Sequence, residues 1–136
     1  MKYRTVAAAV VVSLVGFHAN AQSVPSPTEV AARWKAYLTD TTFTYYRGPT
    51  ISRDGSNATV WKVSIPTPSL SKIGLGAIYE RATYDCAGKR KQIVEFQRFK
   101  ADGSPQTNSD NVVKLNHWAP VLSASDTALQ AAVCAR

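Results

Sequence analysis

Histidine is scarce in this 136-residue chain, which contains two, His18 and His117. Acyl transfer of the Ser-His-Asp type needs a nucleophile, a base and an orienting acid, and the neighbours of His117 offer no such signature. Zinc sites need clusters of histidine and cysteine, and one histidine beyond residue 21 with two cysteines is too few. The sequence therefore predicts a protein that is not an enzyme and holds no metal or cofactor.

Long apolar runs are also missing. The run from Val6 to Phe17 is shorter than the roughly 20 residues that a membrane-spanning helix needs. Residues 1–21 combine this run with a basic start and the small-residue site Ala19-Asn20-Ala21, which is the pattern of a signal peptide cleaved after Ala21. No cysteine follows that site, so a lipid anchor is not expected. We predict an exported protein that is periplasmic, secreted or at the cell surface.

Acidic residues are outnumbered, with 9 Asp and Glu against 16 Lys and Arg, and the formal net charge is +7. Loss of Lys2 and Arg4 with the signal peptide lowers this charge from +7 to +5. A basic exported protein meets anionic glycans, acidic lipid headgroups or acidic proteins, whereas cytoplasmic nucleic acid is out of its reach. The predicted partner is a protein or an anionic polymer at the envelope or host surface, and a homodimer is left open.

The most concentrated basic feature is a turn and the strands beside it. A binding patch is predicted there, with the candidate residues Lys89, Arg90, Lys91, Arg98, Lys100 and Arg81. The alternative is a solvated turn whose lysines discourage pairing of the sheet edge with other chains. Tyr45, Tyr46 and Tyr79 are interpreted either as exposed aromatics of such an interface or as ordinary strand formers.

Cysteine is limited to Cys86 and Cys134, and two cysteines in an exported chain are predicted to form one disulfide. Closing the loop between them would stabilise the fold by roughly 4 kcal/mol in the chain-entropy model. A catalytic thiol would need an activating base, so both cysteines are interpreted as structural.

Turn residues and periodic apolar residues divide the chain into short elements. After a linker at 22–27, Ser26, Pro27 and Glu29 form a capping box that predicts a helix over residues 27–37, although residues 34–38 also fit a strand. Strands are predicted at 41–46, 51–53, 58–65, 77–86, 90–100 and 112–118. Residues 66–76 and 101–111 are predicted to be exposed loops.

Alternation within these strands predicts which sides are buried. In 58–65, Lys62 and Ser64 alternate with the apolar residues Trp61, Val63 and Ile65, as in a strand with one buried and one solvated side. In 90–100 the alternation breaks at Ile93 and Val94. That break predicts a bulge, or a central strand covered in part on both faces.

A short helix is predicted to close the chain. Ser125 is its predicted N-cap, Asp126 supports its N-terminal end, and its predicted buried residues are Leu129, Ala132 and Val133. We therefore predict one α+β domain over residues 28–136. It consists of a small antiparallel sheet of about five to six strands, an N-terminal helix, and a C-terminal helix tied to the sheet by one disulfide.

A series of short motifs resembles the bacterial surface-adhesin protein E family over residues 41–134. The matching residues are Tyr45-Tyr46, Ile51, Asp54-Gly55, Val60-Trp61, Tyr84-Asp85-Cys86, Trp118-Ala119-Pro120-Val121, Ser125 and Cys134. The resemblance implies a small antiparallel sheet with helical cover, a disulfide between the matched cysteines, and a role at the bacterial surface. The namesake adhesin is lipid-anchored and binds host proteins such as vitronectin, laminin and plasminogen, whereas this chain lacks the lipidation cysteine.

These observations give a leading function and a rival. The leading hypothesis is an exported, non-enzymatic envelope or surface binding protein whose sheet engages a protein or an anionic polymer. The rival is a small periplasmic enzyme or enzyme inhibitor with a cleft beside residues 66–76. A carboxylate-lined pocket near His117 would favour the catalytic form of this rival.

Overall fold

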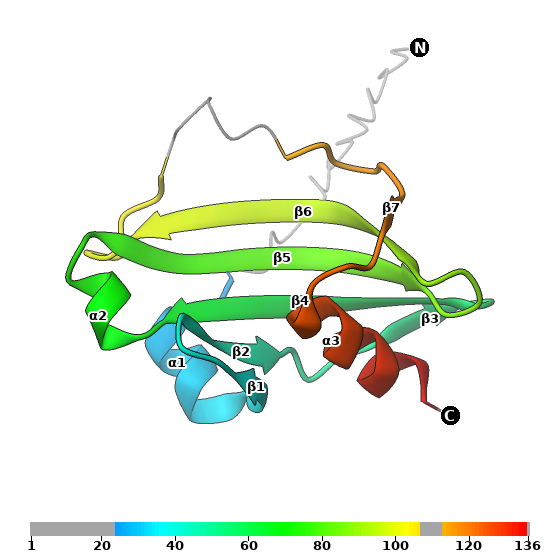
Figure 1. Cartoon of the computed structure of the whole chain (residues 1–136), viewed down its shortest axis with the longest axis horizontal. Helices are drawn as coiled ribbons and strands as arrows, with labels where there is room; N and C mark the ends of the chain where they lie inside the picture. The colour runs from blue at the N-terminus through cyan, green and yellow to red at the C-terminus, as the bar shows by residue number, and fades with distance from the viewer. Residues whose placement is uncertain (1–23, 107–112, 136) are drawn as a thin grey trace, which may run out of the picture.

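The computed structural model describes residues 24–106 and 113–135. Within them the chain forms a curled, seven-stranded antiparallel sheet with three helices, which confirms the α+β class (Figure 1). The strand order is β1-β2-β4-β5-β6-β7, and β3 pairs with the part of β4 that β2 does not reach. The strands are β1 (Lys35–Thr39), β2 (Phe43–Arg47), β3 (Ser52–Asp54), β4 (Asn57–Pro66), β5 (Leu75–Asp85), β6 (Arg90–Lys100) and β7 (Ala119–Pro120). The helices are α1 (Pro27–Arg33), α2 (Pro68–Ser71) and α3 (Ala124–Cys134).

Each face of the sheet has its own core. On the side that we call the α3 face, Leu129 and Val133 pack on strand residues that are at most 2% exposed, namely Ala58, Val60, Ala82 and Tyr84. On the opposite side, the α1 face, Val30 packs with Val63, Ala77 and Tyr79. The prediction that Lys62 and Ser64 face solvent was therefore wrong, because their side of β4 is the α3 face and each is 6% exposed.

Tyr79 lies deep in the core of the α1 face. Its side chain is fully buried, its ring packs edge-on against Phe99, and its hydroxyl donates to the Pro25 carbonyl oxygen at 2.7 Å. The interpretation of Tyr79 as an exposed aromatic was wrong, because β5 is a central strand with helices over both of its faces. Tyr45 and Tyr46 are half-buried strand residues.

The N-terminal helix begins as predicted and ends early. Ser26 Oγ accepts from the Glu29 backbone N–H, and Glu29 Oε2 accepts from the Ser26 backbone N–H, which completes the capping box. The helix stops at Arg33, so its predicted extension to residue 37 was wrong and the strand alternative for 34–38 is confirmed. The helix ends there because the chain from Lys35 onward pairs with β2 as a strand, beginning with Lys35 opposite Arg47.

The central strands match their predictions closely. Asp54 and Asn57 close the β3–β4 hairpin around Gly55, whose φ of 59° suits a tight turn. The predicted irregularity of β6 is a bulge opposite Arg81 and Ala82, where the register shifts by one residue.

Two predicted segments differ from the structure. Residues 66–76 are not a long loop, because β4 extends to Pro66, β5 begins at Leu75, and α2 lies between them. The predicted strand over 112–118 is also wrong in its described part, residues 113–118. The strand is instead the two-residue β7, which pairs with Arg90 and Lys91. Residues 107–111 of the predicted polar loop, and residue 112, lie outside the described residues.

The C-terminal helix has a different cap from the predicted one. Ser123, not Ser125, is the N-cap, and its Oγ accepts from the Asp126 backbone N–H at 3.1 Å. Because the helix begins at Ala124, Ser125 lies inside it and is buried, whereas Ala132 is exposed. Asp126 in the first turn and the burial of Leu129 and Val133 are confirmed.

Replacing the true cap should destabilise the protein more than replacing the predicted one. We expect Ser123→Ala to lower the free energy of unfolding by about 1 kcal/mol, because the first turn of α3 loses its side-chain acceptor. Ser125→Ala keeps that acceptor and should cost less than half as much. Urea unfolding followed by tryptophan fluorescence compares the two, and a larger loss for Ser125→Ala would reverse the assignment of the cap.

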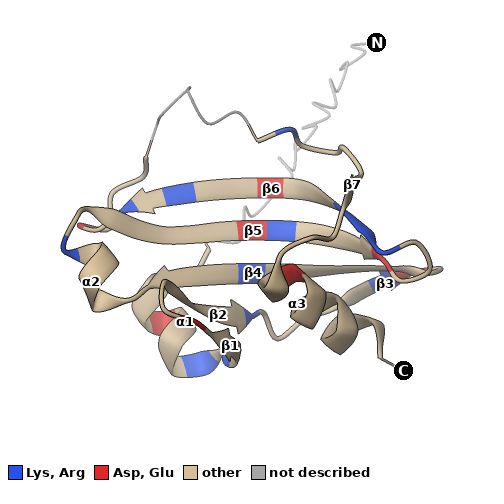
Figure 2. Cartoon of the chain, viewed as in Figure 1, with Lys and Arg blue, Asp and Glu red and all other residues tan. Residues whose placement is uncertain are grey.

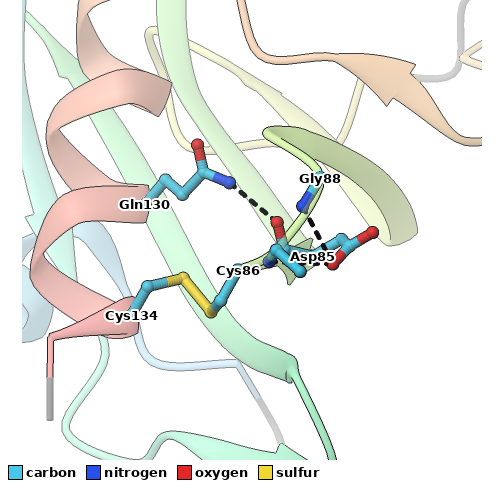
Figure 3. The surroundings of a disulfide bond; sticks show 6 residues. Asp85, Cys86, Gly88, Gln130 and Cys134 are labelled. Carbon is cyan, nitrogen blue, oxygen red and sulfur yellow. Dashed lines mark hydrogen bonds between the residues drawn. A yellow bond between two sulfur atoms is a disulfide. The ribbon is translucent and has the colours of Figure 1, made fainter.

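The disulfide between Cys86 and Cys134 is confirmed and ties the end of α3 to the end of β5 (Figure 3). The two Cα atoms are 5.5 Å apart and the residues are 48 positions apart in the chain. Next to the disulfide, Gln130 Nε2 donates to the Asp85 carbonyl oxygen at 3.0 Å (Figure 3). Within the described ranges, none of the helices is long and apolar enough to cross a membrane.

Candidate functional site

Four charged side chains meet where α3 begins, and we call them the ion cluster: Lys62, Glu80, Lys91 and Asp126. Lys62 Nζ lies 2.8 Å from Asp126 Oδ1 and 3.6 Å from Glu80 Oε1. Lys91 Nζ lies 2.7 Å from Asp126 Oδ2 and 2.6 Å from Glu80 Oε1. Each ammonium group thus contacts both carboxylates, and the charges alternate around a closed ring that joins β4, β5, β6 and α3.

The ion cluster is almost sealed from solvent, since even its most accessible side chain, Lys91, is 14% exposed. Burial opposes the charge of Asp126, but Lys62 and Lys91 outweigh it and hold the pKa of this carboxyl well below its usual range. Burial likewise opposes the charge of Lys91, but Glu80 and Asp126 outweigh it and raise the pKa of this amine. Asp126 and Lys91 therefore remain charged at neutral pH.

Hydroxyl groups complete the surroundings of Asp126. Tyr84 Oη donates to Asp126 Oδ1 at 2.9 Å, and Ser123 Oγ donates to Asp126 Oδ2 at 2.8 Å. Burial first, and then the nearby carboxylates, raise the pKa of Tyr84, so the phenol stays protonated and keeps donating. The cluster therefore fastens α3 to the sheet and offers neither a free nucleophile nor a free base.

The sheet sorts its strand charges by face. Directly opposed residues of antiparallel strands share a face, so the strand register assigns each side chain. Nine strand residues are Lys or Arg, and seven of them lie on the α3 face: Lys35, Arg47, Arg53, Lys62, Lys91, Arg98 and Lys100. Four are Asp or Glu, and three of these lie on the α1 face: Asp54, Asp85 and Glu95. Glu80 and Asp126 neutralise two of the seven positive charges, which leaves a net charge of five on the α3 face.

The predicted basic patch is divided between the two faces. Figure 2 shows Lys and Arg at both ends of β6. By the register, three of the six candidates lie on the α3 face (Lys91, Arg98 and Lys100), two lie on the α1 face (Arg81 and Arg90), and Lys89 occupies the exposed turn. The structure therefore does not bring these six residues together on one surface.

Several of these candidates already have partners. On the α1 face, Arg81 Nε donates to Glu95 Oε1 at 2.9 Å. Arg90 Nε donates to Asp85 Oδ2 at 2.9 Å, and its guanidinium lies 4.7 Å from the ring centroid of Trp118. Since Lys91 belongs to the ion cluster, half of the predicted patch is neutralised by carboxylates.

Three basic residues that the sequence patterns did not single out complete the α3 face: Lys35, Arg47 and Arg53. Lys35 lies directly opposite Arg47, and Arg47 lies directly opposite Lys62, so three cations form a row across β1, β2 and β4. Like charges in opposed positions destabilise a sheet. Alternation along each strand is visible in the sequence, but the pairing of the strands is not, so this row could not be predicted.

An open hollow of about 690 Å³ lies beside the disulfide. Its lining residues are Arg53, Gly55, Ser56, Asn57, Cys86, Ala87, Cys134 and Ala135. Arg53 is the one charged side chain among the described residues that line it. His117, which the catalytic rival needs, is exposed and does not line this hollow, and neither do residues 66–76.

Within residues 24–106 and 113–135, no group of three or more His, Cys, Asp or Glu is placed to hold a metal ion. The chain matches no family model, no curated protein and no solved structure. Its resemblance to the protein E family therefore stays a prediction, and the function has to be argued from the charges and geometry of the chain itself.

Proposed function

We propose that this chain is an exported, non-enzymatic binding protein whose α3 face engages an anionic polymer of the cell envelope or of a host surface. The observation that carries the proposal is the excess of positive charge on that face, where five of the seven strand cations remain after Glu80 and Asp126 neutralise Lys62 and Lys91. The disulfide supports export, because disulfides form and persist in oxidising compartments. The resemblance to a family with a surface role points the same way.

The spread of the cations favours a polymer over a small anion. Lys35 lies on β1 at one side of the α3 face, and Arg98 and Lys100 lie on β6, four strand spacings away. At about 4.8 Å per spacing, this separation measured along the curled sheet is roughly 20 Å. A ligand that contacts both groups must carry several anionic groups over that distance, as an acidic polysaccharide does.

Binding should depend on the row of opposed cations. We expect Lys35→Gln with Arg47→Gln to weaken binding of heparin, used as a model polyanion, roughly 30-fold at low ionic strength, since each cation near an anionic surface contributes about 1 kcal/mol. The fold should be unaffected, because the pair that is removed consists of like charges in opposed positions. Isothermal titration calorimetry over a series of salt concentrations measures the change.

The matched control removes the same charge elsewhere. Arg33→Gln with Arg81→Gln takes two positive charges from α1 and from the α1 face, and it should change the affinity by less than about threefold, because distant exposed charges are screened. Equal losses in both variants would indicate diffuse attraction to net charge. Absence of saturable binding by the folded protein to heparin and to polyglutamate would contradict the proposal.

A further inference from the structure

The two cysteines of the disulfide border the hollow described above. Cys86 and Cys134 both line the hollow and both are half-buried, not sealed in the core. A volume of about 690 Å³ lies within the range of roughly 300–1,000 Å³ that small-molecule sites occupy. A small thiol can therefore approach the sulfur atoms while the sheet stays folded.

Arg53 gives this approach a charge preference. Its side chain lies on the α3 face of β3, opposite Ala58, and forms no ion pair among the described residues. The neighbouring carboxylate, Asp54, lies on the opposite face of the hairpin. The attacking species in exchange is a thiolate, so a cation beside the hollow attracts it, and attracts a thiol with a second negative charge more strongly.

We propose that the hollow is a thiol–disulfide exchange site selective for anionic low-molecular-weight thiols, and that the mixed disulfide forms on Cys134. The incoming thiolate bonds to Cys134 Sγ, the Cys86–Cys134 bond breaks, and its electron pair leaves on Cys86 Sγ as a thiolate. A second thiolate can then displace the first from Cys134, so two thiols are oxidised to a disulfide as the protein disulfide is reduced. This inference does not depend on the proposed binding function.

The position of each cysteine decides which sulfur leaves. Cys134 is the last residue of α3, where the negative end of the helix dipole disfavours a thiolate. Cys86 follows the end of β5, so once the bond breaks its sulfur is no longer held at the helix terminus. The thiolate is therefore better accommodated on Cys86, and a thiol of lower pKa is the better leaving group.

Exchange would break the covalent link between α3 and the end of β5, while the noncovalent contacts of the helix remain. The ion cluster holds Asp126 in the first turn, and Leu129 and Val133 stay packed on the strands. Opening the disulfide therefore removes the covalent link at Cys134 while the helix stays docked on the sheet. Thiol exchange at this site would therefore control whether the end of α3 is covalently attached to the sheet.

The test compares two thiols on the full-length oxidised protein and on two variants. Mercaptopropionate carries a negative charge and mercaptoethanol is neutral, and their exchange rates are followed by acid quenching and mass spectrometry. We expect Arg53→Gln to lower the ratio of the two rates about fivefold at low ionic strength, as the loss of one nearby charge predicts. Arg33→Gln, which removes the same charge from α1, should leave the ratio unchanged. The intrinsic reactivities of the thiols cancel in this comparison.

Two results would overturn the proposal. One is a ratio of the two exchange rates that Arg53→Gln does not change. This result is also expected if exchange requires global unfolding, because unfolding would then limit the rates with both thiols equally. The other is a peptide map that places the mixed disulfide mainly on Cys86. A lowered ratio together with an adduct on Cys134 supports the site, whether or not the α3 face binds a polyanion.

Discussion

Replacing Asp126 by alanine is expected to lower the free energy of unfolding by about 3–5 kcal/mol, because removing one member of a buried charge arrangement leaves its partners uncompensated. Asp126 contacts both Lys62 and Lys91, and Tyr84 donates to it. Without it, two nearly buried ammonium groups share Glu80 as their remaining carboxylate. Urea unfolding followed by tryptophan fluorescence measures the loss.

The control for this substitution removes the whole cluster. Replacing all four members by apolar residues of similar size should cost much less than Asp126→Ala, because it takes away the charges together with their partners. Comparable losses for the two proteins would mean that packing, not charge, holds α3. A loss below about 1 kcal/mol for Asp126→Ala alone would show that the ion cluster contributes little net stability.

Acid should reproduce part of this effect in the unmodified protein. The folded-state pKa of Asp126 lies below the ordinary value of about 3.9, so its contribution is present above that value and is lost as the pH falls toward the folded-state pKa. Asp126→Asn should therefore flatten the fall in stability below about pH 4. Unfolding curves collected at several acidic pH values test this sign.

Removal of the disulfide is the second large effect. We expect Cys86→Ala with Cys134→Ala to lower the free energy of unfolding by about 4 kcal/mol, because the unfolded chain regains the entropy of an open loop between residues 48 positions apart. The measurement is urea unfolding of the purified variant. Reduction of the unmodified protein should give the same loss within about 1 kcal/mol. A variant that keeps the full stability would mean that α3 is held entirely by its other contacts.

The elements that could be predicted are those with strong local signals. The capping box at Ser26 and Glu29 marks the start of α1, the Asp54-Gly55 pair marks a hairpin, and the break in alternation at Ile93 and Val94 marks the bulge of β6. Two cysteines in a chain with a predicted signal peptide leave one intramolecular pairing. Each of these features depends on residues that are close in the chain or few in number.

The features that were missed depend on contacts between distant residues. The alternation in β4 predicts that Lys62 faces solvent. In the structure, α3 brings Asp126, 64 positions away in the chain, into contact with it. The sequence places Lys91 in a basic turn, whereas pairing of β5 with β6 brings its ammonium group to Glu80. The two-residue β7 has no pattern long enough to detect, and its strand character comes from Arg90 and Lys91 on the neighbouring strand.

The division of strand charges between the two faces gives the molecule an electric moment across the sheet. The α3 face is positive, whereas the strands contribute three carboxylates and two cations to the α1 face. In the field of a negatively charged surface, such a molecule experiences a torque before it makes contact. The α3 face therefore tends to turn toward the surface before contact. A larger fraction of collisions then begins in a productive orientation than random tumbling alone would give.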